Sequence, residues 1–219
     1  MKHPGVLRSK WGLLLAAICV LAVATLAADV EGKFSLFGNS KFVTGGLGPN
    51  ETAVDLTSNC GAQPYSNTCS VNSPFVFSGV AFNTNPNKLP TLNQLTILAT
   101  DYNMNGTDCS GGSPRFVIFT NLHNYELNIG QAPFGGNCYY GWQNTGNVAS
   151  ATDPTPRWQV DVGNTFFKWS DVLASHGSEQ VTEVDIVLDG GWIAPRGQDV
   201  TVDNFTVNDN VFPGKAGHH

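Results

Sequence analysis

The chain has 219 residues, and only 13% of them are charged, with 11 basic and 17 acidic side chains giving a formal net charge of −6. After residue 28 the basic residues are scattered singly and the net charge is −9. Binding to nucleic acid requires clustered Lys and Arg, so this distribution excludes it. The length is sufficient for one domain with a sizeable core.

Residues 1–28 have the pattern of an export signal. Lys2, Arg8 and Lys10 precede an uncharged apolar run over residues 11–28 that ends in small residues, as signal peptides do. This run is shorter than the about 20 residues of a typical spanning helix, so we expect cleavage. Retention as a membrane anchor through residues 11–28 is the alternative. In either case the body is expected to be secreted, extracellular or part of the cell envelope.

Four cysteines follow the leader, and an even number in an oxidising compartment predicts two disulfides. Closeness in sequence favours Cys60 with Cys69 and Cys109 with Cys138 among the three possible pairings. A zinc site is the alternative, and the absence of any Cys-x-x-Cys pair disfavours it.

Alternating and short apolar runs, bounded by Gly, Pro, Asn and Ser, predict an all-β body. The expected strands are 41–45, 52–57, 74–82, 94–102, 115–120, 125–130, 184–188 and 199–207. One short helix interrupts them, with Ser170 as its cap and Gly177 at its end.

Eight to ten strands without a sequence repeat predict a two-sheet antiparallel β-sandwich of jelly-roll type. The expected division is a signal segment over 1–28, an adapter or edge strand over 29–40, the sandwich domain over 41–209 and a flexible tail over 210–219.

Four short segments carry a resemblance to a known kind of domain. They are Gly111–Phe116 (GGSPRF), Gly141–Asn147 (GWQNTGN), Val187–Trp192 (VLDGGW) and Val202–Phe205 (VDNF). Together they resemble a secreted bacterial β-sandwich domain similar in layout to jelly-roll carbohydrate-binding modules, over about residues 42–208. The resemblance implies the sandwich fold.

The resemblance also implies a structural calcium ion, because many jelly-roll modules bind one through an acidic residue in the last strand. Asp203 occupies the comparable place, and Asn50, Glu51 or Asp55 are candidates for further oxygen ligands. The alternative is that Asp203 is a solvated strand residue or accepts hydrogen bonds in a turn.

Aromatic residues give the second functional signal. Tyr140 and Trp142 lie in a Gly-rich segment beside Cys138, and Trp192 follows a Gly-Gly pair. Exposed rings on a firm loop can stack on sugar rings, so these three are the candidate ligand-binding residues, with burial in the core as the alternative. Trp158 and Trp169 are expected to be core residues.

No catalytic set is convincing. Glu183 and Asp185 project from the same face of one strand, as a glycosidase pair could. The alternative is that they form the solvent-facing side of an edge strand. Nucleophile and metal motifs are absent from the sequence. We therefore expect a non-catalytic module that binds carbohydrate or another extracellular ligand, with calcium as the structural ion that the resemblance implies. The alternative is a structural or adhesive envelope protein with no small-molecule ligand.

Overall fold

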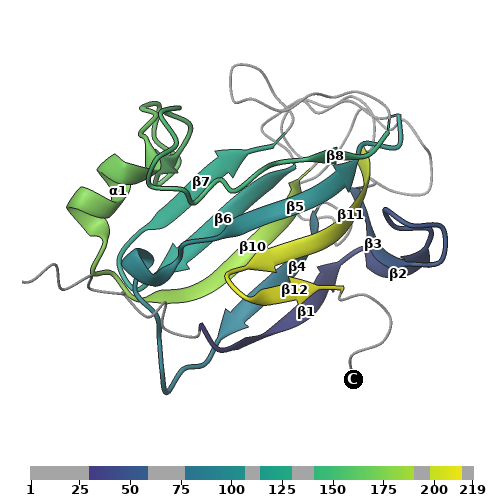
Figure 1. Cartoon of the computed structure of the whole chain (residues 1–219), viewed down its shortest axis with the longest axis horizontal. Coiled ribbons are helices and arrows are strands. Elements are labelled where there is room, and N and C mark those ends of the chain that lie inside the picture. The colour runs from purple at the N-terminus through teal and green to yellow at the C-terminus, as the bar shows by residue number, and fades with distance from the viewer. Residues whose placement is uncertain (1–29, 59–76, 107–113, 130–140, 190–197, 214–219) are drawn as a thin grey trace, which may run out of the picture.

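The computed structural model describes residues 30–58, 77–106, 114–129, 141–189 and 198–213, and strands dominate them (Figure 1). In spatial order, the first sheet contains β1 (Gly32–Gly38), β4 (Phe77–Thr84), β10 (Val181–Asp189), β6 (Arg115–Thr120), β7 (Asn124–Asn128) and β9 (Gln159–Val160). The second contains β2 (Ser40–Thr44), β3 (Thr52–Ser58), β11 (Gln198–Val207), β5 (Leu98–Asn103) and β8 (Gln143–Asn144), and β12 (Asn210–Phe212) also pairs with β11.

All pairings between the described strands are antiparallel. The chain crosses repeatedly from one sheet to the other, so strands that are distant in sequence, such as β4 and β10, become neighbours. These crossings are typical of jelly-roll sandwiches, and the predicted two-sheet sandwich is confirmed.

Alternation along the strands builds the core between the sheets. In β10, Val184, Ile186 and Leu188 are fully buried against the second sheet, while Glu183 and Asp185 lie on the opposite face. Aromatic rings join the two layers at the centre. Phe205 of β11 packs on Phe34 and Phe116 of the first sheet, with ring centroids 5.6 and 6.0 Å apart.

The predicted helix is present as α1 (Trp169–His176), and Gly177 ends it as expected. Its N-cap is Lys168 and not Ser170, which is already the second helical residue. The helix begins earlier because Trp169 is drawn into the core, where its ring lies 4.8 Å from that of Trp158. Both tryptophans are buried, as predicted.

Several predicted boundaries move. Residues 29–40 contain β1, which is an edge strand of the first sheet. The strand expected from residue 94 begins at Leu98, because a 3₁₀ turn (η1, Leu92–Gln94) precedes it. The sequence did not reveal β8, β9 and β12, which have two or three residues each.

The expected tail from residue 210 is too long, because Asn210–Phe212 pairs with Phe205–Val207 of β11. The leader, the four cysteines and residues 214–219 lie outside the described residues. Within the described ranges, no helix combines the length and apolarity needed to cross a membrane.

Candidate functional site

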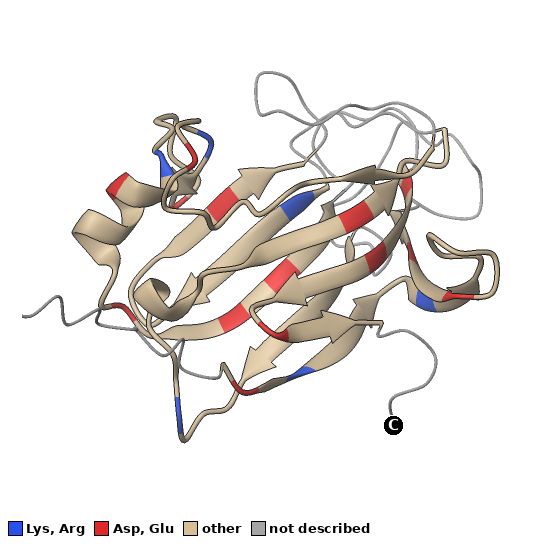
Figure 2. Cartoon of the chain, viewed as in Figure 1, with Lys and Arg blue, Asp and Glu red and all other residues tan. Residues whose placement is uncertain are grey.

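The outward face of the second sheet carries two rows of polar side chains that run across the strands. Residues directly opposite in antiparallel strands project from the same side, so register alone assembles each row. One row contains Lys41, Asp55, Thr201 and Asn103, and the other contains Asp203, Asp101 and Asn144. Figure 2 shows the acidic residues on β5 and β11.

Hydrogen bonds fix the amides in this face against the carboxylates. Asn144 and Asn204 donate their amide N–H groups to the two oxygens of Asp101, at 2.7 and 2.8 Å. Asn204 reaches Asp101 because it lies at an irregularity of β11 with a φ of 49°. Asn105 donates to Asp199 Oδ1 at 2.7 Å and to Thr201 Oγ1 at 2.8 Å. The face is therefore an organised polar network, most of which is buried: Asp55, Asp101 and Thr201 are only 8–9% exposed.

Its electrostatic character is acidic. Burial and the adjacent Asp55 carboxyl raise the pKa of Asp199, against the opposing hydrogen bond from Asn105. The exposed ammonium of Lys41 lies 3.1 Å from Asp55 Oδ2. Carboxylates thus outnumber cations on this face, which disfavours anionic ligands.

Trp142 lies at the margin of this face, immediately before β8, and is half-buried. The preceding Gly141 has a φ of 95° and donates its backbone N–H to Asn103 Oδ1 at 3.2 Å. This contact ties the start of β8 to the polar rows. Tyr140 and Trp192 lie outside the described residues. Of the three predicted aromatics, the structure therefore describes Trp142 alone.

Asp203 is buried, with 2% of its surface exposed. Its Oδ2 accepts the backbone N–H of Leu47 at 2.9 Å and its Oδ1 that of Asn204 at 2.7 Å. Burial raises its pKa, although these two N–H groups oppose the shift. The expectation of a solvated Asp203 is therefore wrong, and its carboxylate accepts hydrogen bonds, as the same alternative allowed. These contacts account for the buried carboxylate without an ion, and calcium binding stays a prediction.

Glu183 and Asp185 lie on the outer face of the first sheet, on β10. Asp185 pairs across the sheet with Ala81 and Val117 and is 5% exposed. Burial, together with the charge and hydrogen bond of Glu183, raises its pKa to about 8. The pair is thus a buried acid beside a second carboxyl, so the expectation of a solvent-facing position is wrong for Asp185. Glycoside hydrolysis stays the alternative to the non-catalytic role that we expect.

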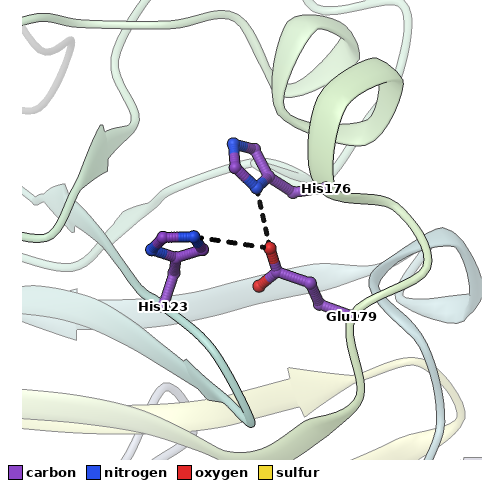
Figure 3. A group of neighbouring side chains, drawn as sticks. All are labelled: His123, His176 and Glu179. Carbon is purple, nitrogen blue, oxygen red and sulfur yellow. Dashed lines mark hydrogen bonds and ion pairs between the residues drawn. The ribbon is translucent and has the colours of Figure 1, made fainter.

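A second cluster of polar side chains, His123, His176 and Glu179, lies near the end of α1 (Figure 3). His123 lies in the β6–β7 turn, His176 is the last residue of α1, and Glu179 precedes β10. One ligand atom from each lies within 4.8 Å of the others. His176 Nδ1 is 2.7 Å and His123 Nε2 is 3.9 Å from Glu179 Oε1.

Neighbouring groups hold the cluster in place. Glu179 is buried, and its Oε2 accepts the hydroxyls of Thr120 at 2.7 Å and Tyr125 at 2.9 Å. Burial opposes its ionisation, but hydrogen bonds from Thr120, His176 and Tyr125 outweigh burial and lower its pKa.

His123 is held from its other side. Its Nδ1 lies 2.6 Å from Asp161 Oδ2, and this hydrogen bond raises the pKa of His123. Asp161 lies in the turn that follows β9 and has a φ of 50°. Its Oδ1 accepts the Asn124 backbone N–H at 3.0 Å.

Sequence reasoning missed this cluster because its parts come from two distant segments. Only His176 and Glu179 are near neighbours, and a single His-x-x-Glu spacing is a weak signal. The segments meet because Asn121 N–H donates to the Gln180 carbonyl at 3.0 Å and Gln180 N–H to Asn121 Oδ1 at 2.9 Å.

A depression of about 490 Å³ lies elsewhere, between the start of β1 and the residues that end and follow β4. Its lining includes Glu31, Lys33, Asn83 and Asn85 but none of the predicted ligand residues. Comparison with known proteins gives no match to a family, to a curated protein or to a solved structure. The geometry of these sites is therefore what points to a function.

Proposed function

We propose that this chain is a secreted, non-catalytic β-sandwich protein that binds a neutral glycan on the outward face of its second sheet, beside Trp142. The observation that carries the proposal is the pair of cross-strand polar rows, in which amides and carboxylates from four strands are fixed by one another. Groups held before binding lose little conformational freedom when a ligand arrives.

The chemistry of the face selects the ligand class. Amides donate and accept hydrogen bonds, whereas carboxylates accept them, which suits the hydroxyl groups of a sugar. A neighbouring indole offers an apolar surface to the C–H face of a sugar ring. Because the face carries Asp101 and Asp199 with Lys41 paired to Asp55, phosphorylated or sulfated ligands are repelled.

The test is a glycan array with wild type, Trp142→Ala and Asn144→Ala. We expect neutral oligosaccharides to bind, and both variants to weaken binding by roughly 10-fold, the equivalent of about 1.4 kcal/mol. Asn83→Ala is the matched control, because Asn83 is an exposed amide on β4 of the other sheet. Unchanged binding by correctly folded Trp142→Ala and Asn144→Ala would overturn the proposed surface.

Calcium is the cofactor that the resemblance implies, and a melting experiment tests it separately. A calcium ion bound through Asp203 would stabilise the folded chain by an amount that grows with the logarithm of the free calcium concentration above the Kd. The melting temperature should then fall on adding chelator and return with calcium, and Asp203→Asn should abolish that response. An equal melting temperature with and without chelator would remove calcium from the proposal while leaving glycan binding intact.

One observation favours the alternative role in adhesion. Phe42 of β2 is 56% exposed, and its ring lies 5.7 Å from that of the partly exposed Phe212 of β12, measured between ring centroids. An exposed aromatic ring beside a second one can mark a protein contact. A blank glycan array, together with binding to isolated cell envelopes that Phe42→Ser abolishes, would support adhesion instead of glycan binding.

A further inference from the structure

We propose that His123, His176 and Glu179 form a binding site for a divalent transition-metal ion, with zinc as its best occupant. The site is separate from the proposed glycan surface, because it lies near α1 whereas β8 lies toward the other end of the sandwich (Figures 1 and 3). Trp142 directly precedes β8 in the chain. Two imidazoles and a carboxylate are a donor set that zinc accepts, whereas calcium prefers oxygen ligands alone.

The hydrogen bonds around the cluster leave one ligand atom of each residue directed inward. Glu179 uses Oε2 for Thr120 and Tyr125, so Oε1 is the oxygen that faces the histidines. His123 bonds Asp161 through Nδ1, which leaves Nε2 to carry the lone pair in the neutral ring. His176 presents Nδ1 to the same Oε1, while its other nitrogen points away.

The distances suit a shared ion after small rotations of the side chains. Two atoms bound at about 2.0–2.1 Å to a tetrahedral zinc lie about 3.3 Å apart. The two separations from Glu179 Oε1 are 2.7 Å to His176 and 3.9 Å to His123, one below and one above that value. An ion between the rings replaces the direct contact between His176 and Glu179.

Asp161 provides the outer support that metal-binding histidines need. A histidine ligand generally donates its second ring N–H to a carboxylate or carbonyl, which fixes the ring and its tautomer. Asp161 does this for His123, and its own second oxygen is anchored by the Asn124 N–H. The hydrogen bonds between Asn121 and Gln180 fix the two segments relative to each other.

The site is open to solvent on its histidine side. The side chains of His123 and His176 are 35% and 29% exposed, whereas that of Glu179 is 6% exposed. An ion can therefore enter without unfolding the protein, and a position remains for water. A zinc site with three protein ligands keeps its fourth position open, whereas structural zinc sites have four protein ligands.

The test is zinc titration of the full chain by calorimetry and by thermal shift. The chain carries His3→Ala, His218→Ala and His219→Ala, so that histidines near the termini do not compete. We expect one high-affinity zinc per chain. Free zinc at about 100 times the Kd should raise the melting temperature by roughly 5–10 °C, and cobalt should give the visible bands of a tetrahedral site.

Variants assign the binding to these residues. His123→Gln and His176→Ala should each abolish saturable binding, and Asp161→Asn should weaken it by about 10-fold. Asp171→Asn is the matched control, because Asp171 is exposed on the same helix. Circular dichroism and the metal-free melting temperature establish that each variant is folded.

Zinc binding that survives in folded His123→Gln and His176→Ala would place the metal elsewhere, for example at cysteines, and overturn the proposal. Absence of zinc binding to the folded parent chain would also overturn it and leave the cluster as a hydrogen-bond network. Glycan binding by the same variants separates the two proposals, because neither His123 nor His176 belongs to the polar face.

Discussion

At the scale of single residues, the carboxyl of Asp185 couples its ionisation to folding. Burial and Glu183 raise its pKa from 3.8 to about 8. A raised carboxyl pKa contributes stability that is fully present below the unfolded pKa and is lost as pH rises through the folded pKa. We expect Asp185→Asn, whose side chain stays neutral, to gain stability relative to wild type between pH 4 and pH 9.

The measurement is the melting temperature of both proteins across that pH range, where each kcal/mol of stability corresponds to about 2–4 °C. Asp209→Asn, an exposed carboxyl in the β11–β12 turn, is the control and should follow the wild-type profile. Parallel curves for Asp185→Asn and wild type would show that Asp185 is ionised in the folded protein at all of these pH values.

Tyr125 provides a second residue-scale prediction. Its ring is buried and its hydroxyl donates to Glu179 Oε2 at 2.9 Å. Hydrogen bonds to charged groups contribute about 1.5–3 kcal/mol, so Tyr125→Phe should lower the free energy of unfolding by about that amount. The experiment is urea unfolding in the presence of EDTA, which keeps any metal out of the comparison.

A double-mutant cycle makes the Tyr125 prediction specific. In a Glu179→Gln background the hydroxyl no longer meets a charge, so the cost of Tyr125→Phe should fall. An equal cost in both backgrounds would attribute the loss to ring packing and not to the hydrogen bond.

At the scale of elements, Asn208 joins the β11–β12 turn to the segment that leads into β5. Its Oδ1 accepts the backbone N–H groups of Thr96 and Ile97 at 2.9 and 3.1 Å, and its amide donates to the Gln94 carbonyl at 2.7 Å. It also has a φ of 50°, which few residues other than Gly and Asn adopt readily.

We expect Asn208→Ala to lower the free energy of unfolding by about 3 kcal/mol for the lost hydrogen bonds and about 1 kcal/mol more for backbone strain. Asn208→Gly removes the same hydrogen bonds but tolerates the positive φ. Chemical unfolding should therefore rank wild type above the Gly variant and the Gly variant above the Ala variant. A Gly variant no better than the Ala variant would exclude the backbone contribution.

Elements with strong alternation were predictable from sequence, and those made by tertiary contact were not. Val184, Ile186 and Leu188 recur with the strand period and mark β10 without ambiguity. Gln143–Asn144 has no apolar alternation and becomes β8 only because Asp101 and Tyr102 supply its partners. The cluster of His123, His176 and Glu179 was hidden for the same reason, since His123 meets His176 only after the strands have paired.

At the scale of the whole molecule, the sandwich separates its two candidate sites. The polar rows were partly predictable, because Asp203 and Trp142 stood out in the sequence. Their partners Asp101 and Asn144 could not be named without the register of β5, β8 and β11. Strand register, which sequence patterns fix only by alternation, therefore determines both sites.

One buried aromatic contact between the two sheets is expected to contribute strongly to the stability of the whole molecule. Phe205 of β11 is fully buried and packs on Phe34 of β1 and Phe116 of β6. Truncating a buried Phe costs about 3–5 kcal/mol through lost burial and the cavity left behind. We expect Phe205→Ala to lower the melting temperature by roughly 6–20 °C at about 2–4 °C per kcal/mol.

The loss should affect both sheets together, because Phe205 belongs to one layer and its partners belong to the other. Near-ultraviolet circular dichroism, which reports side-chain packing, and far-ultraviolet circular dichroism, which reports the strands, should therefore give one coincident transition. Leu122→Ala is the control, since Leu122 is 68% exposed and its truncation should change stability by about 0.5 kcal/mol or less. Two separate transitions in Phe205→Ala would show that the sheets unfold independently, which a core shared between both layers does not allow.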